Sequence, residues 1–184
     1  NPGGCGNDLA IDDISLKLCE PPISIASSTP QPCEGQSYSL NAQVTGFSSP
    51  AFQWQKSIDN GNTWIDINAQ TSSTLQFSAI SGIDNGLYRV LVAPNRTSIT
   101  NENCRTASTP VNVNVNPLPT PGISLLGDSI ICNGSTTLLS SNQVSGFTYQ
   151  WYKNDTIIQN ANDSTLLVNS TGIYSLSISN ALGC

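Results

Sequence analysis

Residues 84–92 read Asp-Asn-Gly-Leu-Tyr-Arg-Val-Leu-Val, and residues 170–174 read Ser-Thr-Gly-Ile-Tyr. Each stretch has turn-forming residues, then a glycine, and then a tyrosine two positions later, which predicts a turn that leads into a strand. In the first stretch the apolar residues Tyr88, Val90 and Val92 fall at every second position, the period of a strand with one buried face. The same turn and strand are therefore predicted at two places in the chain.

This unit is part of a longer repeat that relates residues 33–104 to residues 132–184. Both copies contain, in the same order, a Cys-x-Gly, a leucine, a Gly-Phe, a Gln-Trp, a second leucine, the Gly-x-Tyr and a final cysteine. The landmarks begin at Cys33 and Cys132, Leu40 and Leu139, Gly46 and Gly146, Gln53 and Gln150, Leu75 and Leu166, Gly86 and Gly172, and Cys104 and Cys184. Because the second copy is shorter between landmarks, the differences are expected in loops.

Strand-type alternation continues through the rest of the repeat, whereas no segment has the apolar spacing of an amphipathic helix. The alternation recurs at 38–44, 52–54, 75–77 and 111–115, with a turn at 59–62. We therefore predict an all-β fold of sandwiches, in which Trp54 and Trp151 fill the space between two sheets. Tyr88 and Tyr174 are each expected to fasten a corner of a sandwich through the hydroxyl group.

Composition excludes several classes of function. The 184-residue chain has no histidine, which removes the commonest general base and imidazole metal ligands, and we expect no enzyme activity. Six basic against 12 acidic residues argue against nucleic-acid binding. No apolar stretch approaches the roughly 18–20 residues that cross a membrane, so no membrane insertion is expected. Six cysteines, none in a C-x-x-C pair, predict disulfides and an extracellular, oxidising compartment.

The tryptophan and Gly-x-Tyr landmarks resemble those of immunoglobulin-like (Ig-like) domains, with the tryptophan on strand C and a tyrosine corner at the start of strand F. The variant C-x-G … Q-W … G-x-Y … C is similar to the tandem Ig-like repeats of large cell-surface and secreted proteins of the Bacteroidetes. Those proteins include gliding-type adhesins, and many are exported by type IX secretion. The resemblance covers most of the chain and implies Ig-like domains in tandem.

The cysteines depart from the antibody-type pattern, in which the second cysteine lies two residues after the corner tyrosine. This chain has Val90 and Leu176 at those positions. We therefore expect a bond in each repeat from the start of strand B to the F–G turn, which would pin one end of the sandwich. Cys19 is left to pair with Cys5 or with a cysteine of a preceding domain. The expected pairs are Cys33–Cys104, Cys132–Cys184 and Cys5–Cys19.

The domain organisation follows from the limits of the repeat. Residues 1–19 lie outside it and resemble the last strand of a MAM-like or galactose-binding-like jelly roll. We expect a first Ig-like domain at residues 20–117 and a second, truncated one without strand G at residues 118–184. Alternating prolines at 117–121 predict a stiff, extended linker. The sequence is therefore expected to be an internal segment of a longer protein.

Asp12 and Asp13 are the candidate metal ligands. In galactose-binding-like folds such residues help to hold a structural calcium, and no other cofactor is expected. Adjacent strand residues point to opposite faces, so the alternative is a polar strand end that faces solvent. Trp64 either stacks on a sugar or packs at a sheet edge, and we favour packing. The remaining candidate carboxylates are expected to cap backbone N–H groups in turns: Asp59, Asp66 and Asp84.

Three Asp-Ser or Asp-Thr triplets, at 128–130, 155–157 and 163–165, resemble the O-glycosylation sequon of Bacteroidetes. The acceptor hydroxyls would be those of Ser129, Thr156 and Ser164. The competing explanation is chance, because serine and threonine are common in this chain.

Together these features predict a non-catalytic structural and adhesive spacer within a large extracellular surface protein. Its expected partners are the neighbouring domains of the same chain, with surface glycans or proteins as further partner classes. One alternative is a subunit of an extracellular filament, in which one copy donates a strand to the next. The other alternative is a set of accessory modules of an exported enzyme that degrades polysaccharide or protein.

Overall fold

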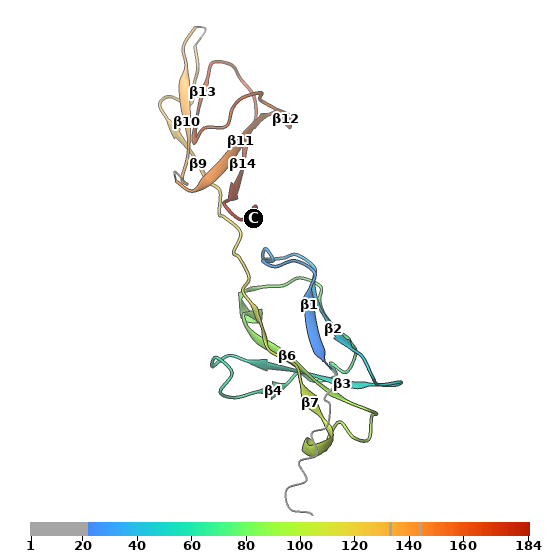
Figure 1. Ribbon diagram of the computed structural model, residues 1–184. Helices are drawn as coiled ribbons and strands as arrows, with labels where there is room; N and C mark the ends of the chain where they lie inside the picture. Colours follow the sequence, from blue (N-terminus) through green and yellow to red (C-terminus); the bar gives the residue numbers. More distant parts are fainter. Residues whose placement is uncertain (1–21, 133, 144) are drawn as a thin grey trace, which may run out of the picture.

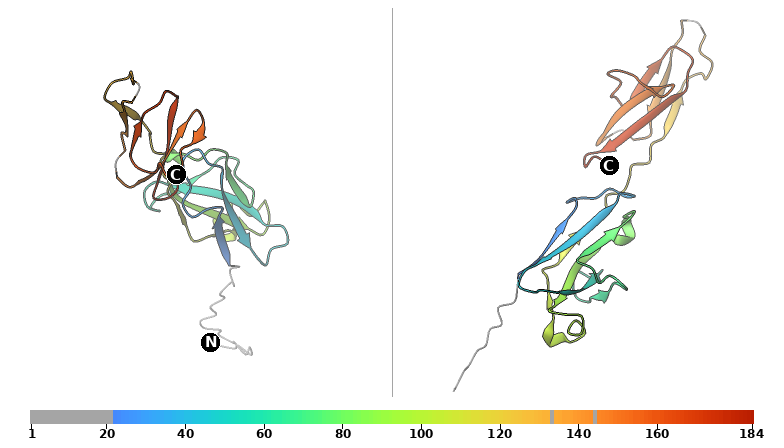
Figure 2. Two further views of the ribbon diagram at one scale, coloured as in Figure 1. Left: turned by 90° about the horizontal axis from the view of Figure 1, so that it is seen from above. Right: turned by 90° about the vertical axis from the view of Figure 1, so that its right-hand side faces the viewer.

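The computed structural model describes residues 22–132, 134–143 and 145–184. It consists of two β-sandwiches that follow one another along the chain, connected by the extended residues 117–121 (Figures 1 and 2). The strands of both sandwiches pair in an antiparallel manner, so the predicted all-β sandwich fold is confirmed. The jelly-roll strand predicted at 1–19 lies outside the described residues.

The first sandwich contains two sheets that face each other. One sheet has the order β1-β2-β5, with β1 (Ile23–Ser27), β2 (Tyr38–Val44) and β5 (Thr74–Phe77). The other has the order β4-β3-β6-β7, with β4 (Ile65–Asp66), β3 (Ala51–Ser57), β6 (Gly86–Ala93) and β7 (Thr106–Ala107). β8 (Val111–Val113) also pairs with β6, and short 3-10 helices lie at η1 (Gly82–Asp84) and η2 (Glu102–Cys104).

The second sandwich repeats this plan with fewer strands. One sheet has the order β13-β10-β9, with β9 (Ile123–Leu126), β10 (Thr137–Ser141) and β13 (Thr165–Val168). The other has the order β12-β11-β14, with β11 (Phe147–Lys153), β12 (Thr156–Ile157) and β14 (Tyr174–Asn180). Within the described part of the chain β14 is an edge strand, whereas its counterpart β6 pairs with β3, β7 and β8.

The repeated tryptophans occupy the same position in the two cores. Trp54 and Trp151 are both fully buried. Each indole N–H donates a hydrogen bond of 2.9 Å to a backbone carbonyl, that of Ser72 in the first sandwich and that of Asp163 in the second. A buried indole that keeps its hydrogen bond contributes apolar area without an unsatisfied donor. The Gln-Trp landmark of the sequence therefore marks the centre of each core.

The repeated tyrosines fasten equivalent corners. The Tyr88 hydroxyl donates to the Asp84 carbonyl at 2.7 Å, and the Tyr174 hydroxyl donates to the Ser170 carbonyl at 2.9 Å. Tyr88 is buried and Tyr174 half-buried. Burial raises the pKa of Tyr88 above its ordinary value. Both tyrosine corners predicted from the Gly-x-Tyr landmarks are thus present.

The two cores differ in size. The first is built from the buried residues Tyr38, Leu40, Trp54, Leu75, Ile80, Tyr88, Val90, Val92, Val113 and Val115. The buried centre of the second consists of Leu139, Trp151 and Val168. Val113 and Val115 follow β7 and close one side of the first core, and the described residues of the second sandwich contain no equivalent strand. The second sandwich therefore buries less apolar surface for its stability.

Candidate functional site: a disulfide at the junction of the two sandwiches

A disulfide joins the two sandwiches. The sulfur atoms of Cys33 and Cys184 are 2.04 Å apart and the Cα atoms 5.5 Å apart, although 151 positions separate the residues in sequence. Cys33 precedes β2 in the first sandwich, and Cys184 follows β14 in the second. Both residues are less than 9% exposed, so the bond lies within the junction rather than on its surface.

Backbone hydrogen bonds fasten Cys33 to the end of its own sandwich. The Glu34 N–H donates to the Asn116 carbonyl at 2.8 Å, and the Asn116 N–H donates to the Pro32 carbonyl at 2.9 Å. These bonds flank Cys33, which forms a β-bridge with Asn116 itself. Because Asn116 directly precedes Pro117, the disulfide and the linker leave the first sandwich at the same point.

A tight turn presents the Cys33 side chain. The Gln36 N–H donates to the Cys33 carbonyl at 3.2 Å, and the Gln36 side-chain oxygen accepts from the Cys33 N–H at 3.1 Å. Gly35 adopts φ +80°, a left-handed conformation that favours glycine. The Cys-x-Gly landmark therefore encodes a turn that holds the cysteine in place.

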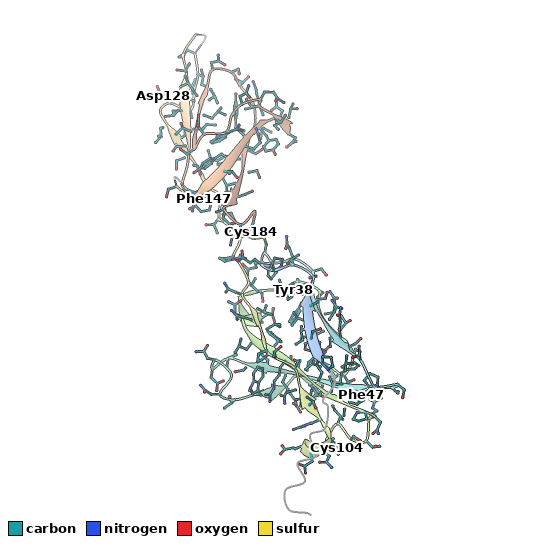
Figure 3. All side chains as sticks on the ribbon, viewed as in Figure 1. Tyr38, Phe47, Cys104, Asp128, Phe147 and Cys184 are labelled. Atoms are coloured by element: carbon teal, nitrogen blue, oxygen red, sulfur yellow. A yellow bond between two sulfur atoms is a disulfide. The ribbon has the colours of Figure 1, made fainter. Side chains whose placement is uncertain are left out.

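A second compact turn presents Cys184. The Asn180 side-chain oxygen accepts from the N–H groups of Leu182 and Cys184, each at 3.0 Å. The Asn180 N–H donates to the Cys184 carbonyl at 2.8 Å, and Gly183 adopts φ +82°. The chain thus closes on itself immediately after β14, which directs Cys184 toward the first sandwich (Figure 3).

The predicted pair Cys33–Cys104 is wrong because those cysteines lie at opposite ends of the first sandwich. The Gly35 N–H donates to the Ile80 carbonyl at 2.7 Å, so Cys33 lies near the connection that leads into β6. β6 then runs the length of the sandwich before the chain reaches Cys104, which Figure 3 shows at the far end from Cys184.

The predicted pair Cys132–Cys184 is wrong for the same reason. Cys132 lies in the connection between β9 and β10, where Leu126 pairs with Leu138. The other end of this strand pair, at Ile123, adjoins the linker and the first sandwich. Cys184 lies at the linker end, and Cys104 and Cys132 are both exposed and unbonded to other described cysteines. The predicted Cys5–Cys19 pair lies outside the described residues.

Trp64 packs against the protein rather than standing free. The Arg89 guanidinium lies 4.2 Å from the centre of the Trp64 ring, and the indole N–H donates to the Gly61 carbonyl at 3.1 Å. The Arg89 Nε also donates to the Gln55 side-chain oxygen at 2.7 Å, which holds the guanidinium over the ring. The expected packing at the sheet edge is confirmed by this cation–π contact.

Of the three carboxylates expected to cap backbone N–H groups, Asp59 and Asp84 do so. The Asp59 side chain accepts from the Thr63 N–H at 2.9 Å, from the Thr63 hydroxyl at 2.6 Å and from the Ser57 hydroxyl at 2.7 Å. These hydrogen bonds, first of all that from the Thr63 hydroxyl, lower the pKa of Asp59 to about 2. Asp84 accepts from the Ser81 N–H, whereas Asp66 accepts from the Gln55 side chain instead.

The glycosylation candidates differ in exposure. Ser129 and Thr156 are exposed, and Thr156 lies on the short strand β12. Ser164 is half-buried, and its carbonyl accepts from the Ser141 N–H at 2.7 Å. The metal candidates Asp12 and Asp13 lie outside the described residues. Over the ranges that the structure describes, no group of three or more His, Cys, Asp or Glu residues could hold a metal ion.

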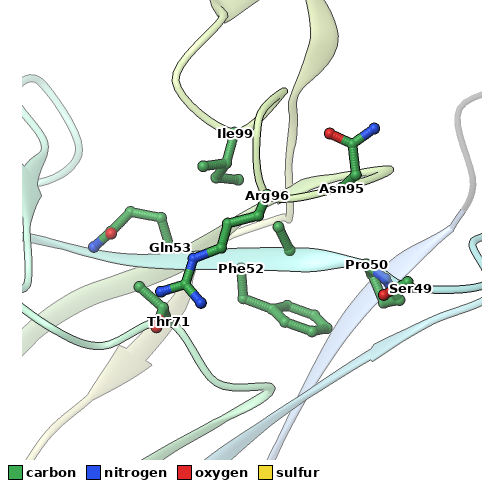
Figure 4. A pocket seen from close by; sticks show the side chains of 9 residues that line it. Ser49, Pro50, Phe52, Gln53, Thr71, Asn95, Arg96 and Ile99 are labelled. Atoms are coloured by element: carbon green, nitrogen blue, oxygen red, sulfur yellow. The ribbon is translucent and has the colours of Figure 1, made fainter.

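A shallow cavity of about 280 Å³ lies at the end of the first sandwich away from the junction. Its lining residues come from the start of β3 and the loop after β6, and Arg96 extends over β3 toward Thr71 (Figure 4). No carboxylate or lysine is among the lining residues, so the cavity contains no general base. None of the helices in the described ranges has the length and apolar character required to cross a membrane.

Among known protein families, one matches the first sandwich. A family model described as "Domain of unknown function" (DUF8696) matches residues 23–117, the segment that contains β1–β8. No curated protein matches the chain.

Several solved structures are similar to the chain. For murine CEACAM1b the identity is 20%, the match covers 86% of this chain and 92% of that one, and the TM-score is 0.41. The three N-terminal domains of the bacteriophage RB49 highly immunogenic outer capsid protein are 16% identical. That match covers 88% of this chain and 55% of that one, with a TM-score of 0.46. The second Ig-C2 domain of human Fc-receptor like A is 16% identical. That match covers 53% of this chain and 98% of that one, with a TM-score of 0.36.

The match of the family model extends from the first residue of β1 to the first residue of the linker and spans more than half of the chain. The chain therefore belongs to the family described as "Domain of unknown function" (DUF8696).

Proposed function

We propose that this chain is a non-catalytic spacer of a large extracellular surface protein, in which consecutive Ig-like repeats are held head to tail by a disulfide. The Cys33–Cys184 bond carries the proposal, because it gives the two sandwiches a second covalent connection beside the linker. Two connections at one junction limit rotation of one sandwich about the other, which a single linker does not. A bonded junction of this kind suits a part that keeps a binding or enzymatic module at a distance from the cell.

Disulfide chemistry supports the extracellular setting. Stable disulfides form in secreted and surface proteins and are rare in the cytosol. The bonded cysteines are buried, which shields the bond from attack by external thiolates. The adhesin-like Bacteroidetes proteins that the sequence resembles, many of them exported by type IX secretion, are the class in which we place this spacer.

Small-angle X-ray scattering of the oxidised chain and of Cys184→Ser tests the proposal. We expect the oxidised chain to give one narrow distribution of interatomic distances. The variant is expected to give a broader distribution with a larger mean radius of gyration, because the linker alone then joins the sandwiches. Cys104→Ser is the matched control, since that cysteine is exposed and lies at the far end of the first sandwich. Identical scattering from the oxidised chain and Cys184→Ser would refute the bonded spacer.

A second candidate function is a filament subunit that accepts a strand from another copy. The edge strand β14 supports it, because its hydrogen-bonding groups on one side have no partner strand among the described residues. Sedimentation of the purified chain over a range of concentrations tests this candidate. Polymers that dissociate only in denaturant would support it, and a monomer at every concentration would exclude it.

A further inference from the structure

The two cysteines outside the junction disulfide occupy the same places in the repeat as the two that form it. Cys132 opens the second Cys-x-Gly, as Cys33 opens the first. Cys104 closes the first copy of the repeat, as Cys184 closes the second. Each sandwich therefore contains one cysteine of each kind, and the observed bond joins unlike kinds from different sandwiches.

The turn that holds Cys132 has the geometry of the turn that holds Cys33. The Ser135 N–H donates to the Cys132 carbonyl at 3.0 Å, matching the 3.2 Å bond from Gln36 to Cys33. Gly134 adopts φ +88°, close to the +80° of the first Cys-x-Gly turn. The second sandwich thus presents its cysteine on the same turn that, in the first sandwich, holds a bonded one.

The turns that hold Cys104 and Cys184 also share a feature. The Asn101 side-chain oxygen accepts from the Asn103 N–H at 3.0 Å, just as the Asn180 side-chain oxygen accepts from an N–H two residues later. Asn180 is the last residue of β14 and Asn101 lies in the loop after β6, and each caps a turn that ends in cysteine. Cys104 is therefore presented on a capped turn, as the bonded Cys184 is.

The positions of these cysteines along the molecule complete the pattern. Cys132 lies at the end of the second sandwich away from the linker, and Cys104 lies at the end of the first sandwich away from the junction. Cys33 and Cys184 are buried in their contact, whereas Cys104 and Cys132 are exposed. Each outer end of the two-sandwich unit thus presents one exposed cysteine that could form a disulfide with a neighbouring repeat.

We propose that Cys132 forms a disulfide with the cysteine that ends the next Ig-like repeat of a head-to-tail array, in the manner of Cys33–Cys184. Cys104, which ends the first repeat, pairs correspondingly with the Cys-x-Gly cysteine of the repeat that precedes it in the array. This inference rests on the proposed function and adds that the disulfides continue in series, one at every junction. The partner is an Ig-like repeat of this kind with a cysteine on a capped turn after its Gly-x-Tyr strand.

The bond forms by ordinary thiol–disulfide exchange. The two cysteine thiols lose two protons and two electrons to a small-molecule disulfide such as oxidised glutathione, which is reduced to two thiols. A sulfur–sulfur bond forms between the repeats. The exposure of Cys132 leaves its thiol accessible to the oxidant and to the incoming cysteine.

A three-repeat chain tests the inference directly. Because Cys104 and Cys184 are equivalent, a second copy of residues 105–184 joined after Cys184 extends the repeat in register. In this appended copy Cys132→Ser removes the duplicate cysteine. After oxidation in a glutathione buffer, the disulfide-linked peptides are mapped under non-reducing conditions. Trypsin distinguishes the two copies of Cys184, because the first copy's last peptide ends in Arg105 and the appended one in Cys184. A second digestion that cleaves after Pro22 separates Cys19 from Cys33.

We expect Cys132 to be bonded to the appended Cys184 and to lose its reactivity toward a thiol alkylating reagent. In the matched control the original copy also carries Cys132→Ser. The appended Cys184 is then expected to stay a thiol and to react with the alkylating reagent. A chain in which Cys33–Cys184 forms but Cys132 stays a thiol would overturn the inference and leave the proposed function intact. Loss of Cys33–Cys184 itself would count against the proposed function instead.

A second measurement covers the case in which the three-repeat chain does not fold. The unaltered chain is oxidised at high concentration, and its disulfide-linked dimers are mapped. Bonds between Cys132 of one copy and Cys104 of another are expected to exceed the share that random pairing of the two thiols gives. A random distribution, or a predominance of pairs between like cysteines, would overturn the inference.

Discussion

The Cys33–Cys184 disulfide determines which part of the chain bears a stretching force. Tension applied between the two ends passes through β1 to Cys33, crosses the sulfur–sulfur bond and leaves at Cys184. The residues between the two cysteines, which include most of both sandwiches, lie outside this path. We therefore expect the oxidised chain to resist extension even when the force exceeds the strength of either sandwich.

The expected difference in length follows from the separation of the cysteines. An extended residue spans about 3.3–3.6 Å, so releasing 151 residues lengthens the chain by roughly 500 Å. In the oxidised chain these residues contribute only the 5.5 Å between the two Cα atoms. Detachment of β1 and the residues up to Cys33 adds about 35 Å for some ten residues on the same scale.

Single-molecule force spectroscopy with handles before residue 1 and after residue 184 measures this difference. The oxidised chain is expected to show the short extension alone. Cys184→Ser, or reductant added to the unaltered chain, is expected to add the unfolding steps of both sandwiches. Cys104→Ser should behave as the unaltered chain does. The reasoning would be refuted by steps of sandwich length in the oxidised chain, or by an unchanged extension after reduction.

Three further predictions concern the sandwiches themselves. Thr63→Val is expected to raise the pKa of Asp59 from about 2 toward its ordinary value of 3.8, measured by NMR titration, because the largest cause of the shift is the Thr63 hydroxyl. Since the pKa of Asp59 is depressed in the folded chain, its stabilising effect is present above pH 3.8 and is lost as the pH falls toward 2. An unchanged Asp59 pKa in Thr63→Val would contradict the role given to the Thr63 hydroxyl. Trp54→Phe is expected to cost about 1–3 kcal/mol in urea unfolding, because the smaller ring leaves part of the fully buried Trp54 site unfilled and the indole hydrogen bond to Ser72 is lost. Trp64→Phe keeps a ring beneath Arg89 and should cost less. A peptide of residues 106–116 is expected to pair with β14 and to stabilise the second sandwich by about 2.7 kcal/mol at one hundred times its dissociation constant, seen as a saturable rise in melting temperature. A peptide whose valines are shifted by one position is the control, and equal effects of the two peptides would exclude pairing in register.

The sequence predicts the parts of the fold that depend on local patterns. Trp54 and Trp151 were expected in the two cores because each lies in an alternating segment, and both are fully buried. The tyrosine corners were expected from a glycine and a tyrosine two residues apart, and both hydroxyls make the corner hydrogen bond. Such features are set by a few neighbouring residues, which a single sequence displays directly.

The disulfide pairing was not predictable from the same patterns, because it depends on which end of a sandwich each cysteine reaches. β2 and β6 begin at the same end of the first sandwich and run in the same direction. Cys33, which precedes β2, forms a β-bridge with Asn116, and the N–H of the adjoining Val115 donates to the side chain of Asn85, which directly precedes β6. A cysteine before β2 and one after β6 are consequently a full strand length apart. The repeat contained the necessary signal, because its spacing places unlike cysteines at adjoining ends of consecutive sandwiches, but strand directions had to be known first.

Stability alone does not explain why the cysteines join two sandwiches rather than close each one. On the chain-entropy model, a loop of 151 residues gains about 5 kcal/mol, and one closed by Cys33 and Cys104 gains about 4 kcal/mol. The difference is small because the gain grows only with the logarithm of loop length. The positions that bridge the sheets in antibody-type domains hold Val90, which is fully buried, and Leu176, so apolar packing replaces a bond through the centre. The cysteines are thereby left to act at the ends of the sandwiches, where a bond fixes one repeat to the next.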